Sequence, residues 1–179
     1  MKALALVLFL LAANIASAQS LRVIPVKIQG DDNFPKAIRF FCTREYPSER
    51  CVQDAITLQL ILRRHPVANL GVWNFVMATS DAWKNLVRSL GGITGSPAFS
   101  VLGNRTTVLE EALFSPLGHR RAELIRMFGT VDRDLLEQAV SHELGHVLCG
   151  ELNENRAAHN GQDLYAGGVG VCQVNRQRP

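Results

Sequence analysis

Two histidines stand four residues apart in the apolar stretch that precedes Gly150. His142 and His146 are separated only by Glu-Leu-Gly, and no proline interrupts the stretch. Residues at positions i and i+4 lie about one turn apart on the same face of a helix, so both imidazoles can reach one metal ion. The spacing therefore predicts a largely buried helix that presents two nitrogen ligands and ends at Gly150, where glycine permits a left-handed turn.

Glu143 directly follows the first histidine, and we expect it to project toward the same opening without binding the metal. A carboxylate in that place can take a proton from a metal-bound water and pass it to a leaving amine. Zinc suits such a site, because it binds three protein ligands and a water and lowers the pKa of that water to about 7. The pattern predicts Zn2+ held by His142 and His146, with Glu143 as the general base.

The ten residues from Ala139 to Leu148 are A-V-S-H-E-L-G-H-V-L. They resemble the extended signature of the zincin metallopeptidases at all ten positions, whereas the likeness of the remaining chain is faint. The resemblance implies a zinc-dependent hydrolase that cleaves peptide bonds in a peptide or protein substrate. It also implies an α+β, zincin-like fold, with a small twisted sheet packed against helices that include the active-site helix ending near Gly150.

A third protein ligand is needed to complete the predicted zinc site. In the metzincin branch a glycine and then a third histidine follow the second histidine, but this chain has Cys149 and Leu152 at those positions. The gluzincin branch takes a glutamate from a later helix, often in a Glu-x-x-Ala setting, and the run E-N-R-A from Glu154 is similar to that. The resemblance thus implies Glu154, and a turn at Gly150 can send the chain back toward the metal. Four alternatives stay open: His159, Asp163, Glu151 and Cys149.

The N-terminal residues have the pattern of a signal peptide. A basic residue precedes the apolar run 3–13, and Ala16-Ser17-Ala18 supplies small residues for cleavage. We therefore expect residues 1–18 to be removed and residues 19–179 to form a single domain in a secreted or periplasmic location. No second apolar stretch approaches the roughly 20 residues of a membrane-spanning helix, so we expect no stable membrane anchor after cleavage.

The cysteine content agrees with export. All four cysteines lie in the expected mature chain, and an even number in an exported protein indicates two disulfide bonds. Three pairings are possible, and we favour the one that closes the shortest loops: Cys42–Cys51 with Cys149–Cys172.

The overall composition limits the functions that remain. A net charge of +3 is too small for the basic patch of a nucleic-acid-binding protein, and a hydrophobic content of 47% excludes a disordered chain. Two alternatives to a zinc peptidase are left. One is a non-catalytic zinc-binding or interaction module on the same scaffold, and the other is a disulfide-stabilised exported protein whose histidines are surface residues.

Hydrophobic periodicity and turn residues predict the other elements in outline. Apolar residues alternate as in a strand between 56 and 62, but the length of the segment 49–64 favours a helix. The hairpin at 98–114 either belongs to the core or presents an edge to an extended substrate. Tyr165 either packs against the rest of the protein or donates a hydrogen bond to an oxyanion. The predicted elements are an edge strand at 21–28, helix 49–64, strand 72–78, a helix from the N-cap Ser80 to Gly91, strands 98–102 and 106–114, a helix from Ser115 to about 128, the metal-site helix capped by Thr130 or Asp132, and a short helix at 154–159.

Overall fold

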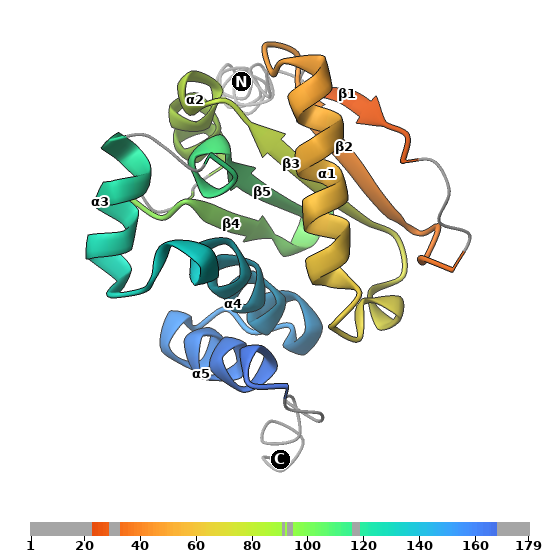
Figure 1. Ribbon diagram of the computed structural model, residues 1–179. Helices are drawn as coiled ribbons and strands as arrows, with labels where there is room; N and C mark the ends of the chain where they lie inside the picture. The colour runs from red at the N-terminus through yellow and green to blue at the C-terminus, as the bar shows by residue number, and fades with distance from the viewer. Residues whose placement is uncertain (1–22, 29–32, 91, 93–94, 116–118, 168–179) are drawn as a thin grey trace, which may run out of the picture.

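The computed structural model describes residues 23–28, 33–90, 92, 95–115 and 119–167 (Figure 1). Within these residues the fold is α+β, with one five-stranded mixed sheet and five α-helices. No helix in the described part of the chain is both long and apolar enough to cross a membrane. The predicted signal peptide lies outside the described residues.

The sheet has the spatial order β1-β2-β3-β5-β4. Its three central strands are parallel, and each edge strand runs antiparallel to its neighbour. Pro25 lies in an edge strand, as predicted, and edge strands tolerate a residue without a backbone N–H. The strands are β1 (Val23–Val26), β2 (Ile38–Thr43), β3 (Trp73–Ala78), β4 (Ala98–Val101) and β5 (Thr106–Glu110).

The helices are α1 (Ser48–Leu62), α2 (Ser80–Leu90), α3 (His119–Phe128), α4 (Leu135–Cys149) and α5 (Glu154–Tyr165), with short 3-10 helices at Val67–Leu70, Leu102–Asn104, Glu111–Leu113 and Asp132–Asp134. Helices α1 and α4 pack against one face of the sheet, and Leu58, Phe75 and Leu144 belong to the larger core there. Helix α2 covers the other face, where the ring of Trp83 lies 5.2 Å from that of Phe99. Helix α5 lies along the outside of α4 (Figure 1).

Several sequence predictions are confirmed, and others are wrong. Helix α1 confirms the helix predicted at 49–64, although it ends two residues earlier, at Leu62. Strands β4 and β5 form the predicted hairpin, and α4 ends at Gly150. No strand is predicted at 38–43, yet β2 lies there between β1 and β3. The second hairpin strand stops at Glu110, short of 114, and α5 continues to Tyr165 instead of stopping at 159.

Two helix caps also differ from prediction. Thr79, and not Ser80, caps α2, because its hydroxyl accepts a hydrogen bond from the N–H of Ala82 at 3.3 Å. Asp134 occupies the N-cap position of α4, in place of the predicted Thr130 or Asp132, since a 3-10 turn precedes the helix.

The disulfide Cys42–Cys51 is confirmed, and it joins β2 to α1. Cys149, the last residue of α4, is also disulfide-bonded. Its predicted partner Cys172 lies outside the described residues.

Candidate metal centre

Three ligand atoms from two helices converge at the junction of α4 and α5. His142 and His146 lie one turn apart on α4, and Glu154 is the first residue of α5. Oε2 of Glu154 lies 3.2 Å from Nε2 of His142 and 3.5 Å from Nε2 of His146. One ligand atom from each of the three residues lies within 4.8 Å of the other two. The structure therefore places all three predicted ligands side by side.

The distances from Glu154 to the two histidines suit a tetrahedral zinc ion. Zinc–ligand bonds of about 2.0–2.2 Å place neighbouring ligand atoms of a tetrahedron about 3.3–3.6 Å apart. The two distances from Glu154, 3.2 and 3.5 Å, are close to that range. Two imidazoles and a carboxylate are also a donor set that catalytic zinc uses, with the fourth position left for water or substrate.

A backbone group fixes the orientation of His146. Its Nδ1 atom lies 2.7 Å from the carbonyl oxygen of Glu151. Because a carbonyl oxygen can only accept a hydrogen bond, Nδ1 carries the proton and Nε2 keeps its lone pair. This contact selects the tautomer of His146 that a metal ion requires.

Glu151 shapes the loop that joins the two helices. Gly150 adopts a left-handed conformation, with φ 59° and ψ 31°, and so ends α4. The buried carboxylate of Glu151 accepts hydrogen bonds from the Arg156 guanidinium at 2.6 and 2.8 Å and from the N–H of Asn153 at 2.8 Å. Asn153 in turn caps α5. Glu151, weighed from the sequence as a ligand, instead holds the turn that brings Glu154 to the histidines.

Two glycines allow α4 and α5 to touch along their backbones. A Cβ atom at Gly145 would collide with the carbonyl oxygen of Ala157, and one at Gly161 would lie 2.7 Å from Cα of His142. Any side chain at either position would therefore push the helices apart. The pair places α5 directly against the turn of α4 that carries the first ligand.

Glu143 is buried beside the ligands, with 3% of its surface exposed. Burial raises the pKa of Glu143 to about 7, while a hydrogen bond from Ser100 and the charge of His146 act in the opposite direction. The Oε2 atom has no hydrogen-bond partner among the described residues. A carboxylate with one free oxygen and a pKa near neutrality has the properties of a general base.

A chain of hydrogen bonds from the sheet ends on Glu143. The indole N–H of Trp73 donates to the Thr107 hydroxyl at 3.0 Å, and this hydroxyl lies 2.8 Å from that of Ser100. Either hydroxyl of this pair can be the donor, and Ser100 also interacts with Glu143, where it lowers the pKa of the carboxyl group. The three side chains lie on β3, β5 and β4. These three side chains are not predicted from the sequence as part of the site, because they come into contact only when the strands pair.

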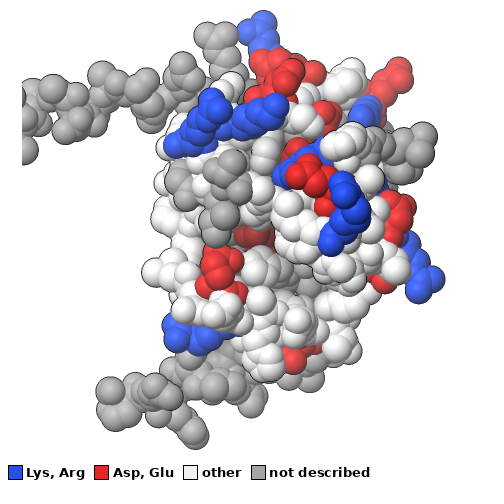
Figure 2. Space-filling model, turned by 90° about the vertical axis from the view of Figure 1, so that its left-hand side faces the viewer, with Lys and Arg blue, Asp and Glu red and all other residues white. Residues whose placement is uncertain are grey.

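Two cavities open beside the ligand atoms, with volumes of about 620 and 330 Å³. Figure 2 shows a hollow on the side of the molecule where α3 lies, with acidic groups in and beside it and most other charged side chains above it. Both volumes lie in the range of roughly 300–1,000 Å³ that is typical of ligand sites. The two cavities share five lining residues: Ser96, Ala98, His142, Glu143 and Glu154.

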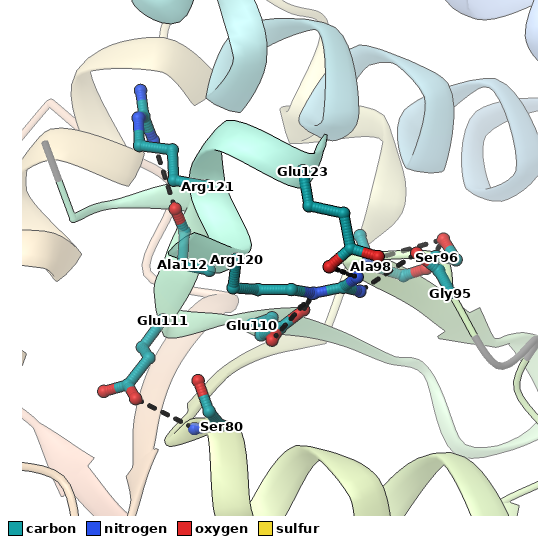
Figure 3. A network of polar contacts seen from close by, with 10 residues as sticks. All are labelled: Ser80, Gly95, Ser96, Ala98, Glu110, Glu111, Ala112, Arg120, Arg121 and Glu123. Atoms are coloured by element: carbon teal, nitrogen blue, oxygen red, sulfur yellow. Dashed lines mark hydrogen bonds and ion pairs between the residues drawn. The ribbon is translucent and has the colours of Figure 1, made fainter. Parts of the chain in front are cut away.

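Arg120 of α3 anchors the segment 95–98, which lines the larger cavity. Its guanidinium donates to the carbonyl oxygen of Gly95 at 3.0 Å and pairs with the buried Glu110 at 3.1 Å (Figure 3). A second ion pair, of 3.1 Å, joins Arg120 to Glu123. The side chain thus ties the rim of the cavity to the end of β5 and to α3.

The other residues considered from the sequence lie away from the ligand atoms. His159 and Asp163 face one another on the exposed side of α5, 4.0 Å apart, and neither belongs to the converging group. The disulfide of Cys149 removes it as a thiolate ligand. Tyr165 lines the larger cavity and is 38% exposed.

Comparisons with protein-family models, with curated proteins and with solved structures found no match for this chain.

Proposed function

We propose that this chain is a zinc-dependent metallopeptidase of the zincin type, closer to the gluzincin branch than to the metzincins. One observation carries the proposal. Ligand atoms of His142, His146 and Glu154 converge within 4.8 Å of one another beside Glu143, a buried carboxylate whose Oε2 atom has no hydrogen-bond partner among the described residues. The combination supports catalysis over the alternative of a non-catalytic zinc module, because metal binding alone has no need of that carboxylate.

The residues of the site divide the chemistry among them. Zinc held by the three ligands would polarise a peptide carbonyl and lower the pKa of a water molecule. Glu143 takes the proton of the attacking water on Oε2 and delivers it to the nitrogen of the departing amine. Ser100 interacts with the same carboxyl group and lowers its pKa, so it favours the charged form that accepts the proton.

Strand β4 is suited to hold an extended peptide across the site. It is an edge strand, paired with β5 along one side only. Ala98 of β4 lines both cavities, together with the ligands His142 and Glu154. An extended substrate can add to such an edge through main-chain hydrogen bonds, as in other strand-adding sites.

We place the enzyme outside the cytoplasm, in a secreted or periplasmic location. The disulfide Cys42–Cys51 supports this, because disulfide bonds persist in oxidising compartments.

The test is the substitution Glu143→Gln in zinc-loaded protein. We expect the variant to keep one zinc ion per chain and to lose turnover of a peptide mixture by roughly 10²- to 10⁴-fold, the usual contribution of a general base. A variant that cleaves as fast as the parent would refute the role of Glu143. Stoichiometric zinc with no peptide cleavage by the parent would instead favour the non-catalytic module.

A further inference from the structure

The larger cavity beside the metal centre is walled mainly by apolar side chains. On α4, Leu135 and Ala139 continue the face of His142 toward the start of the helix. Leu135 lies seven positions before His142, so this wall extends about 10 Å from the ligand. Met127 and Phe128, at the end of α3, also line the cavity.

Exposed apolar residues gather at this cavity. Nine large hydrophobic side chains are exposed in the described part of the chain. Three of them, Met127, Phe128 and Tyr165, line the larger cavity, and a fourth, Leu152, lines the smaller one. Apolar surface concentrated in a hollow indicates a binding site for an apolar group, because water is released when that group enters.

The charges of the lining residues point the same way. Among the described residues that line the larger cavity, only Glu143 and Glu154 are acidic, and both lie at the end of the cavity near the metal ligands. None of these lining residues is Lys or Arg. An acidic side chain entering the cavity would lose its hydration without gaining a partner there. A bulky apolar side chain would lose nothing and would bury its surface.

From these observations we infer that the cavity is the specificity pocket of the proposed peptidase. It binds a large apolar side chain, such as Phe, Leu or Met, from a residue on one side of the cleaved bond. The inference rests on the proposed function and adds the substrate class to it. Phe128 and Met127 are the residues that determine the preference.

The first test uses zinc-loaded parent protein and peptides that differ only at the residue entering the cavity. We expect cleavage beside Phe or Leu to exceed cleavage beside Ala by about 10- to 100-fold in kcat/KM, the gain from burying such a side chain, and cleavage beside Asp to be slowest. In the variant Phe128→Ala, the ratio of kcat/KM for the phenylalanine peptide to kcat/KM for the alanine peptide should decrease. The matched control Val131→Ala, an exposed apolar residue outside both cavities, should leave it unchanged. Equal cleavage of all peptides overturns the specificity and leaves the proposed function standing.

A second readout does not require turnover. N-acetyl-phenylalaninamide and N-acetyl-alaninamide are titrated onto zinc-loaded Glu143→Gln protein, and the methyl resonance of Met127 is followed by NMR. Tighter binding of the phenylalanine compound, with a shift of that resonance, supports the pocket even if no peptide is cleaved. Equal or absent binding of the two compounds overturns it.

Discussion

The Nδ1 atom of His146 lies 2.7 Å from the carbonyl oxygen of Glu151. This contact joins the second ligand to the loop that also delivers the third, since Glu154 follows only three residues later. Arg156 and the backbone of Asn153 hold the carboxylate of Glu151 and so keep its carbonyl in place. Two of the three ligands therefore depend on one buried acidic residue that binds no metal itself.

Replacing Glu151 with alanine should weaken zinc binding by about 10- to 100-fold, as is usual when the partners of a metal ligand are lost. The affinity is measured by competition with a chromophoric chelator. Glu49→Ala removes an exposed acidic side chain from the first turn of α1 and should have no effect. An unchanged affinity in Glu151→Ala would show that the loop holds its shape without this carboxylate.

The substitution Ser100→Ala should lower kcat by about 10-fold or more, because a hydrogen bond to a charged group contributes roughly 1.5–3 kcal/mol. Zinc content should not change, since Ser100 does not belong to the converging group of His142, His146 and Glu154. Ser100→Thr keeps the hydroxyl and should retain most of the activity. If alanine and threonine variants had the same kcat, Ser100 would have no part in orienting Glu143.

Gly161→Ala should destabilise the fold by about 1–3 kcal/mol, the usual cost of overpacking, and should also reduce zinc affinity. The added methyl group would lie 2.7 Å from Cα of His142 and displace α5, which carries Glu154. Gly103→Ala is the control, because a Cβ there meets nothing within 4 Å. Denaturant unfolding and zinc titration of both variants measure the two effects. Normal zinc affinity in Gly161→Ala would contradict close contact of the helices at the site.

Arg120→Met should destabilise the protein by about 3–5 kcal/mol near neutral pH, because it leaves the buried Glu110 carboxylate without its partner. Burial already raises the pKa of Glu110 above its usual value, and the charge of Arg120 lowers it. An acid whose pKa is raised by folding contributes stability at low pH that is lost as the pH rises through the folded-state pKa. Loss of Arg120 raises that pKa further, so the defect should grow as the pH rises.

Unfolding by denaturant at pH 5 and at pH 8 checks this pH dependence. Glu110→Gln combined with Arg120→Met should restore much of the stability at pH 8, since no buried charge is then left unpaired. A defect of equal size at both pH values would contradict the pairing.

The local part of the site follows from the sequence. The spacing of His142 and His146 fixes their common face on any helix, and Gly150 marks the end of that helix whatever its surroundings. Glu154 could be predicted as a ligand because the turn at Gly150 limits where the next residues of the chain can lie. The hairpin of β4 and β5 could also be predicted, because its two strands are joined by a short connection and are therefore close in the sequence.

The features that were missed depend on contacts between distant segments. Strand β2 is a six-residue run whose stability comes from pairing with β1 and β3, and the latter lies some 30 residues further along the chain. The bond from Ser100 to Glu143 requires a strand and a helix to meet. Gly161 counts against a helix by propensity, yet close packing against His142 requires glycine there, and this explains why α5 is longer than predicted.

The zinc content of purified protein tests the central claim most directly, measured for the parent and for Glu154→Ala and Asp163→Ala. We predict one zinc ion per chain in the parent and in Asp163→Ala, whose side chain lies outside the converging group. In Glu154→Ala we predict loss of the ion after dialysis. Retention of zinc by Glu154→Ala, or its absence from the parent, would contradict a metal centre built from His142, His146 and Glu154.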